Sequence, residues 1–228
     1  NFCNKNKIKV IEDCAEAFGT FYKGRHVGNF GDFGTFSFFG NKTISTGEGG
    51  MIIFKKEEDY KLAKKLRDHG MRVTKKYWHD EVGYNFRMTN IQAAIGCAQI
   101  EKANKFIQRK IQIFEKYKIK LKSLKTISMI QNNIKIKNSH WLTFIIVKKK
   151  FLRDDLLQYL NNKGIEARSG FYSAHEMEIY KNFTSKKANY TNSKIISSKI
   201  ITLPSSVSLK NNEINYICKL IKNFFILE

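Results

Sequence analysis

The stretch that decides the fold is residues 36–50, which read Phe36-Ser37-Phe38-Phe39-Gly40-Asn41-Lys42-Thr43-Ile44-Ser45-Thr46-Gly47-Glu48-Gly49-Gly50. An aromatic run, which predicts a strand, leads into a lysine and then into a glycine-rich turn. Upstream, a short apolar strand is expected at residues 8–11, and it ends at Glu12 and Asp13. Lysine amines form Schiff bases, and a nearby aspartate can pair with a pyridinium nitrogen. The pattern therefore favours pyridoxal phosphate (PLP) chemistry at Lys42.

Strands and helices alternate outward from this stretch. Residues 51–54 predict a further buried strand, and a helix is expected from about Glu57 to a glycine cap at Gly70. The run 89–92 has a capping-box pattern that opens a helix of small residues, which suggests close packing against another element. A long helical signal then continues to about Lys125. This signal predicts a connector between two lobes.

The second half of the chain has a different pattern. A strand is expected at residues 141–147, a helix ending at Gly164, a strand from 165 to 168, and an amphipathic C-terminal helix from Ile214 to Phe225. We therefore predict a large domain at residues 1–125, which includes the connector helix, and a small domain at 126–228. The alternation favours an α/β first part and an α+β second part.

The net charge of +21 raises the question of a nucleic-acid partner. Lysine far outnumbers arginine, however, and recognition surfaces for phosphates and bases favour arginine with stacking aromatics. We expect solvated lysines and no nucleic-acid or membrane partner. The four cysteines are scattered without metal spacing, which predicts no metal site and reduced, mostly buried thiols in a cytoplasmic protein.

Several ordered motifs resemble the DegT/DnrJ/EryC1/StrS family of PLP-dependent nucleotide-sugar aminotransferases. The motifs are Val10–Gly19, Lys23–Gly28, Phe36–Gly50, Leu66–Gly70 and Gly83–Gly96. The resemblance implies the aspartate aminotransferase fold (PLP fold type I), with a partial large domain followed by a smaller C-terminal domain. Within the family, Tyr77-Trp78-His79 followed by Glu81-Val82-Gly83-Tyr84 is similar to the members that form perosamine.

The resemblance also implies roles for individual residues. Lys42 would hold PLP and shuttle a proton, and Asp13 would pair with the pyridine nitrogen. Glu16 would lie near the ring hydroxyl, Ser37 would contact the phosphate, and Asn85 would reach the phosphate of a dimer partner. Each has a plainer structural interpretation: a surface lysine, a turn-capping aspartate, a helix-start carboxylate, a small strand residue and a turn asparagine.

Arg168 and His175 match a region that borders the sugar site in the family. Ser169 and Ser173 stand where the family usually has prolines, so a structural role for Arg168 and His175 stays open. The implied reaction transfers an amino group, with glutamate as donor, to a nucleotide-linked 4-keto-6-deoxysugar for perosamine-type O-antigen and lipopolysaccharide biosynthesis. The implied assembly is a homodimer with shared active sites.

The family also carries strands and phosphate donors ahead of the segment that matches Val10. We expect that a front portion of the family's usual chain is absent here, and that this polypeptide alone folds poorly or binds PLP weakly. Two alternatives remain. One is a non-catalytic remnant or an interaction partner of a full-length aminotransferase, and the other is a basic polyanion-binding module.

Overall fold

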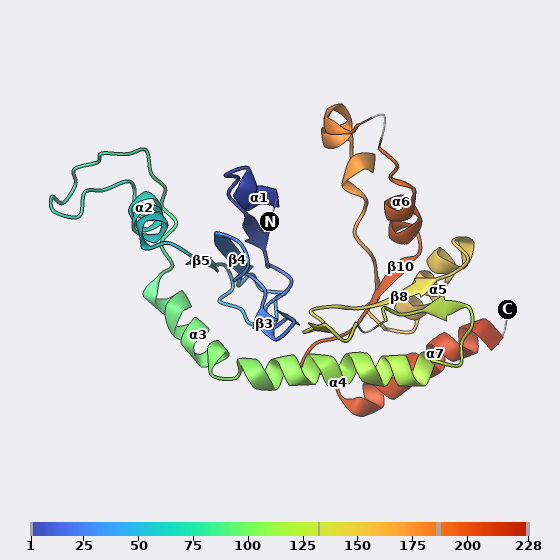
Figure 1. The fold of residues 1–228 in the computed structure, drawn as a ribbon. Helices are drawn as coiled ribbons and strands as arrows, with labels where there is room; N and C mark the ends of the chain where they lie inside the picture. Colours follow the sequence, from blue (N-terminus) through green and yellow to red (C-terminus); the bar gives the residue numbers. More distant parts are fainter. Residues whose placement is uncertain (1, 132, 186–187, 227–228) are drawn as a thin grey trace. The chain divides into compact units, whose positions relative to one another are not determined.

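The computed structural model describes residues 2–131, 133–185 and 188–226. They form two compact units (Figure 1). Of the described residues, 2–108 and 133–141 belong to the first unit, and 109–131, 142–185 and 188–226 belong to the second. The predicted domain boundary at 125/126 stays a prediction. The segment 133–141 belongs to the first unit although it follows the long helix in sequence.

A three-stranded sheet with the order β1-β4-β5 forms the centre of the first unit. Its strands are β1 (Ile11–Asp13), β4 (Phe33–Ser37) and β5 (Gly50–Phe54). β1 and β4 are parallel with Asp13 opposite Thr35, and β4 and β5 are antiparallel with Ser37 opposite Gly50. The carboxyl ends of β1 and β4 therefore lie at the same edge of the sheet.

Two strand predictions for this sheet need correction. The first strand begins at Ile11 and includes both carboxylates, because Val10 is tied to the loop at Asp32: its N–H donates to the Asp32 carboxylate at 2.9 Å. The second correction concerns β5, which was expected to be buried. Met51 and Ile52 are 41% and 49% exposed, and β5 lies next to β4 at the edge of the sheet that the described residues form.

A second small sheet joins distant parts of the sequence within the first unit. Its order is β3-β2-β7, built from β3 (Arg25–His26), β2 (Phe21–Tyr22) and β7 (Ile136–Lys137). β2 pairs antiparallel with β7, so residues after the long helix return to this unit. Trp141 follows β7 by a few residues, so this pairing also places Trp141 in the first unit.

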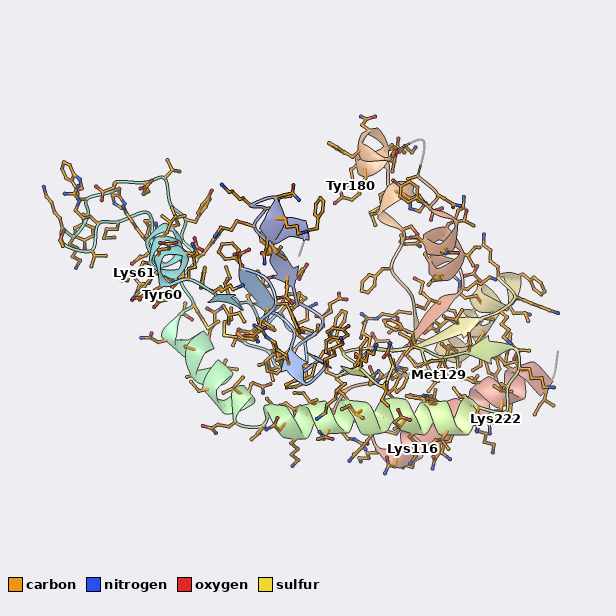
Figure 2. All side chains as sticks on the ribbon, viewed as in Figure 1. Tyr60, Lys61, Lys116, Met129, Tyr180 and Lys222 are labelled. Carbon is orange, nitrogen blue, oxygen red and sulfur yellow. The ribbon has the colours of Figure 1, made fainter. Side chains whose placement is uncertain are left out.

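The first unit also contains helices before and between its strands. α1 (Phe2–Lys5) is short, and α2 (Glu57–Arg67) carries Tyr60 and Lys61, which project from it (Figure 2). α2 ends as predicted, since Gly70 has φ 66° and its N–H donates to the Lys65 carbonyl at 3.0 Å. α3 (Asn90–Ile100) opens with the predicted capping box between Thr89 and Gln92. α4 (Ala103–Leu121) follows as a separate helix and ends four residues before Lys125.

The second unit packs helices on a four-stranded sheet. The sheet order is β6-β8-β10-β9, with β6 (Ile127–Ser128), β8 (Thr143–Val147), β10 (Ile200–Leu203) and β9 (Arg168–Ser169). Its pairings are all antiparallel. α5 (Phe151–Asn162) and α7 (Asn211–Ile226) supply apolar faces, as their sequence periodicity predicts.

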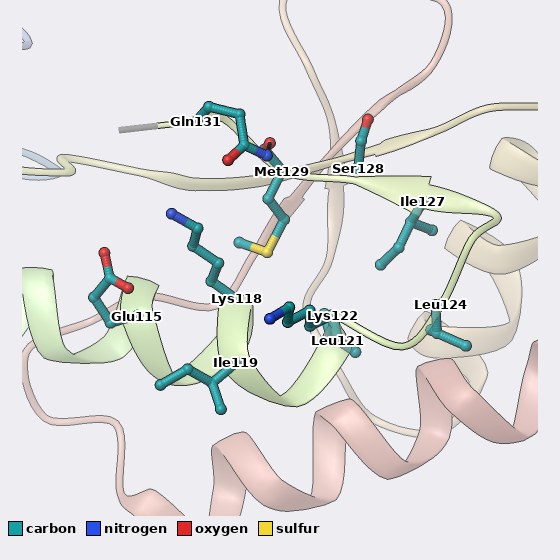
Figure 3. A pocket seen from close by; sticks show the side chains of 10 residues that line it. All are labelled: Glu115, Lys118, Ile119, Leu121, Lys122, Leu124, Ile127, Ser128, Met129 and Gln131. Carbon is teal, nitrogen blue, oxygen red and sulfur yellow. Dashed lines mark hydrogen bonds between the residues drawn. The ribbon is translucent and has the colours of Figure 1, made fainter. Parts of the chain in front are cut away.

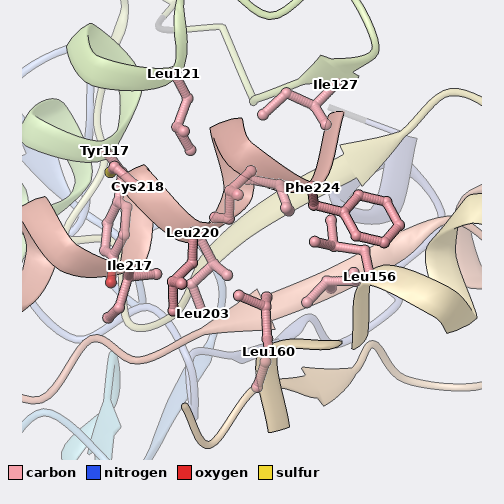
Figure 4. Packing of buried hydrophobic residues seen from close by; sticks show 14 of the residues in the cluster. Tyr117, Leu121, Ile127, Leu156, Leu160, Leu203, Ile217, Cys218, Leu220 and Phe224 are labelled. Atoms are coloured by element: carbon pink, nitrogen blue, oxygen red, sulfur yellow. The ribbon is translucent and has the colours of Figure 1, made fainter. Parts of the chain in front are cut away.

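A continuous hydrophobic core fills the second unit (Figure 4). Leu156, Leu160, Ile214 and Ile221 are fully buried there, and α4 contributes Tyr117, whose hydroxyl donates to the Pro204 carbonyl at 3.0 Å. Burial raises the pKa of the Tyr117 hydroxyl well above its usual value. The unit is completed by α6 (Thr191–Ser197) and two 3-10 turns, η1 (Ala174–Glu176) and η2 (Glu178–Phe183).

Two further observations bear on expectations from the sequence. Among the described residues, no helix combines the length and the apolar character needed to cross a bilayer.

All four cysteines are free, but only Cys14 and Cys218 are buried, while Cys3 is half-buried and Cys97 is exposed. The expectation of mostly buried thiols therefore holds for two of them.

Candidate active site

The loop that carries Lys42 is closed on itself by backbone hydrogen bonds. The Phe38 N–H donates to the Gly49 carbonyl at 2.8 Å, and the Thr46 N–H donates to the Phe38 carbonyl at 2.9 Å. The Lys42 N–H donates to the Phe39 carbonyl at 3.0 Å. These bonds fix where the loop leaves β4 and where it enters β5. The base of the Lys42 side chain therefore has a defined position.

Small residues let other elements approach this loop. Gly47 and Gly49 have φ values of 80° and 142°, which L side chains rarely adopt, and a Cβ at Gly49 would lie 2.7 Å from Thr46 Oγ1. α3 packs against the loop: the Gln92 amide donates to the Glu48 carbonyl at 3.2 Å, and a Cβ at Gly96 would lie 3.1 Å from Thr46. The predicted close packing of α3 thus occurs on its loop-facing side.

The Lys42 side chain is mostly shielded and meets two partners. Its Nζ lies 3.8 Å from a Glu16 carboxylate oxygen and 4.0 Å from the centroid of the Trp141 ring. The Lys42 side chain is 13% exposed, whereas that of Glu16 is 54% exposed. The structure therefore brings together Lys42 and Glu16, which the sequence singled out. Trp141 was not expected here, because a separation of about a hundred residues carries no local signal.

Asp13 and Ser37 lie at the strand ends that flank the lysine loop. Asp13 is the last residue of β1, and its carboxylate accepts the Ala15 N–H at 3.0 Å, which is the turn-capping role of an aspartate. Ser37 ends β4, and its Oγ accepts the Phe39 N–H at 3.3 Å. In sheets with parallel strands, ligands bind outside the carboxyl ends of the strands. The two residues are thus placed where a ligand could meet them.

Glu12 organises the neighbouring turn, a role that the sequence did not indicate. Its carboxylate accepts backbone N–H groups from Gly28, Phe30 and Gly31 at 2.8, 2.5 and 2.6 Å. Hydrogen bonds to a charged acceptor are stronger than those between neutral groups. The signal available in the sequence was a carboxylate beside a glycine-rich segment, and such segments expose backbone donors.

Asn85 is exposed and lies in an extended segment that pairs with Asp68 through an isolated bridge. The preceding segment, 71–82, carries the Tyr77-Trp78-His79 motif. Asp80 anchors it, accepting from Arg72 at 2.8 Å and from Lys65 at 3.2 Å. The Arg72 guanidinium, with Lys65, holds the pKa of the Asp80 carboxyl at about 2. The motif residues are therefore displayed on a segment held by ion pairs.

Arg168 and His175 belong to the second unit. Arg168 lies on β9, is exposed, and its guanidinium contacts Glu166. His175 lies in η1, and its ring stacks on Tyr190 with centroids 4.4 Å apart. Ser173, at a position where the family usually has proline, is buried, and its hydroxyl donates to the Ser197 hydroxyl at 3.1 Å. Both candidate residues thus have local structural partners.

A cavity of about 500 Å³ lies in the second unit between the end of α4 and β6 (Figure 3). Its lining includes Lys118, Lys122, Leu124, Ile127 and Met129. None of the residues singled out from the sequence lines this cavity. It therefore adds nothing to the Lys42 site.

Residues on the Lys42 loop and at the carboxyl ends of β1 and β4 are of the types that fit the chemistry of PLP. A shielded amine on a closed loop, a carboxylate at the end of β1 and a hydroxyl at the end of β4 are the groups needed to attach the cofactor, pair with its ring nitrogen and contact its phosphate. Comparison with known proteins bears on the same question. The model of the DegT/DnrJ/EryC1/StrS aminotransferase family matches residues 1–222.

Two curated relatives share two fifths of their aligned residues with this chain. A GDP-perosamine synthase of Escherichia coli O157:H7 is 43% identical over 95% of this chain and 58% of its own length. A GDP-perosamine synthase of Vibrio cholerae is 42% identical over 99% of this chain and 61% of its own length. The chain thus spans about three fifths of the length of these relatives.

Solved structures give the same result for the fold. Helicobacter pylori PseC, an aminotransferase involved in pseudoaminic acid biosynthesis, superposes on all of this chain and 62% of its own, with a TM-score of 0.91 and 25% identity. The PLP form of a Streptococcus pneumoniae protein described as a candidate sugar aminotransferase gives a TM-score of 0.88 and 26% identity, over 98% of this chain and 59% of its own. These structural similarities confirm the predicted fold class.

Proposed function

The chain belongs to the DegT/DnrJ/EryC1/StrS aminotransferase family, and from this premise we propose that it takes part in PLP-dependent transamination of a nucleotide-linked sugar. The substrate that we propose is a GDP-linked 4-keto-6-deoxysugar, and the donor is glutamate. The similarity to GDP-perosamine synthases supports this choice. One observation carries the proposal: the Lys42 amine is held on a closed loop beside the carboxyl ends of β1 and β4.

Four side chains of this chain would bind the cofactor and move the proton. When bound, PLP supplies an electron sink for the negative charge that develops at the carbon losing its proton. Lys42 would attach the cofactor through Nζ and, once released, would take up and return that proton. Asp13 would hold the proton on the ring nitrogen, and the Ser37 hydroxyl would donate to the phosphate. Glu16 would lie beside the ring, near Lys42 Nζ.

Assembly and location complete the proposal. Asn85 is exposed on the segment that follows the Tyr77-Trp78-His79 motif, which supports a reach towards a second protomer in a homodimer with shared sites. Arg168 and His175 would border the sugar. The four free thiols accord with a cytoplasmic enzyme. O-antigen and lipopolysaccharide biosynthesis is the corresponding pathway class, supported by a Salmonella lipopolysaccharide biosynthesis relative that is 30% identical.

The test is covalent trapping at Lys42. The purified chain is incubated with PLP and reduced with borohydride, and the modified lysine is identified by mass spectrometry. Because reduction makes even a weakly populated imine permanent, we expect the adduct at Lys42 despite the weak PLP binding predicted for this chain, and we expect its loss in Lys42→Ala. Lys75→Ala is the matched control, because Lys75 also lies over an indole ring, that of Trp78 at 3.9 Å, but on an exposed segment. Trapping spread evenly over surface lysines would contradict the proposal.

A second assay tests the substrate. GDP-linked and UDP-linked 4-keto-6-deoxysugars are each supplied with glutamate, and the amino sugar is measured by mass spectrometry. We expect product with the GDP-linked sugar and roughly 5- to 150-fold less with the UDP-linked one, because a hydrogen-bonding group left unsatisfied by the wrong base costs ~1–3 kcal/mol. Product from the UDP-linked sugar alone would overturn the choice of nucleotide.

A further inference from the structure

One contact of the candidate lysine has no role in the function proposed above. The indole face of Trp141 lies against the Lys42 ammonium, with Nζ 4.0 Å from the ring centroid. The edge of the same ring is also engaged, since its Nε1–H donates to the Asn41 carbonyl at 2.9 Å. One side chain thus contacts both the amine of Lys42 and the peptide unit that immediately precedes it.

Burial strengthens both contacts. Trp141 is 7% exposed, and the Lys42 side chain is 13% exposed. An ammonium over an indole face is attracted by the ring quadrupole, and the attraction grows when water is excluded. Trp is the aromatic residue that binds cations best. The shielded Lys42–Trp141 pair therefore contributes more than the exposed pair of Lys75 and Trp78, although the distances are nearly equal.

The segment that carries Trp141 is held to the first unit at several points. β7 pairs with β2, and the Ser139 N–H donates to the Thr20 hydroxyl at 3.2 Å, with the two hydroxyls 2.9 Å apart. Ser139 is 1% exposed. These contacts precede Trp141 by a few residues, so they set the position of its backbone.

The backbone just before Trp141 adopts an uncommon conformation. His140 has φ 51°, in the left-handed region that non-glycine residues rarely occupy, and it is buried. Its N–H donates to the Asn138 side chain at 2.8 Å, which stabilises the turn. Such strain persists where the surrounding structure holds it and often accompanies a functional constraint. Here it turns the chain so that the indole meets Lys42.

We propose that Trp141 is a positioning residue for Lys42: its ring face holds the amine in one orientation, and its N–H fixes the peptide before the lysine. The inference rests on the proposed function for its purpose, because a lysine that must accept and return a proton needs a defined orientation. The carboxylate of Glu16 lies on the same amine at 3.8 Å. Lys42 Nζ is thus oriented by an aromatic face and an acidic group.

The test uses the full chain with isotopically labelled lysine and needs no cofactor. The indole ring current shifts the NMR signal of the Lys42 ε-protons upfield, and Lys42→Arg assigns that signal by its loss. We expect Trp141→Leu to abolish the upfield shift and Trp141→Phe to keep much of it. Trp78→Leu is the matched control: it removes an equivalent ring from Lys75 and leaves the Lys42 signal unchanged.

A second readout links the position to the chemistry. After incubation with PLP and borohydride, the share of adduct at Lys42 should fall severalfold in Trp141→Leu and recover in Trp141→Phe. An unshifted Lys42 signal in the wild-type chain would overturn the positioning role, as would a shift that survives in folded Trp141→Leu. If the shift depends on Trp141 but no lysine is trapped, the positioning role is supported and the proposed function fails.

Discussion

The two units differ in the kind of interaction that orders them. The second has a continuous apolar core in which side chains from α5, β10 and α7 are fully buried. The first buries few large side chains, and apolar residues of β1, β5 and α3 are exposed, with Ile11 at 66% and Ile91 at 77%. Its lysine loop is ordered by hydrogen bonds and by close approach at glycines. A core that excludes water thus stabilises the second unit, while hydrogen bonds and close approach at glycines order the lysine loop of the first.

The largest expected effect follows from the core of the second unit. Leu156→Ala should lower the free energy of unfolding of that unit by about 4 kcal/mol, because a fully buried leucine leaves a cavity. The matched change in the first unit, Ile52→Ala, removes a side chain that is 49% exposed and should cost less than about 1 kcal/mol. Urea denaturation measures both. Equal losses would break the contrast between the units.

A buried ammonium provides a pH test of the second unit. Lys110 is 7% exposed, and burial lowers its pKa to about 8. The unfolded chain keeps this proton up to its ordinary pKa near 10.5, so the stability of the unit should rise between pH 8 and 10.5. The gain should approach about 3 kcal/mol. Chemical denaturation across this range should show the rise in wild type and not in Lys110→Met.

An exposed lysine serves as the control for this pH series. Lys61 lies on α2 and pairs with Glu57 at 2.9 Å, with its side chain 70% exposed. Lys61→Met should therefore leave the pH dependence unchanged. A Lys110→Met chain that still gained stability above pH 8 as wild type does would show that other groups are responsible.

Losing hydrogen bonds in the first unit should lower the free energy of unfolding less than losing a core side chain, but more than losing a surface ion pair. Glu12→Ala leaves the N–H groups of Gly28, Phe30 and Gly31 without their carboxylate acceptor, and we expect a loss of about 2 kcal/mol. Hydrogen exchange at these amides should accelerate while α7 stays protected. The control Glu57→Ala removes an exposed ion pair and should cost under about 0.5 kcal/mol.

Thiol labelling tests the smallest difference between the units. Cys97 is exposed on α3 and should react first with iodoacetamide. Burial raises the pKa of the Cys218 thiol to about 11 and also raises that of Cys14, where Glu12 and Asp13 add to the effect. Mass spectrometry should show Cys14 reacting before Cys218, because local opening of the first unit costs less. The reverse order would contradict the contrast.

Local patterns were predictable where side-chain periodicity or a cap decides the structure. The capping box at Thr89, the end of α2 at Gly70 and the buried face of α7 all follow from neighbouring residues. Two predictions were wrong: the limits of the strand at residues 8–11 and the burial of β5. Both depend on which distant segments pair with or cover the strand, and the local sequence does not reveal these. Pairing is a long-range property.

The sequence by itself determined the family. It also predicts Lys42 and the neighbouring carboxylates as site residues, since these are carried by contiguous motifs around Lys42. Only the tertiary structure decided what surrounds the amine. Trp141 is about a hundred residues from Asn41 in sequence, and it reaches the lysine loop because β7 pairs with β2 and His140 turns the backbone. Chemistry that depends on residue type can be deduced from a motif. Orientation depends on contacts between distant segments, and the fold alone provides these.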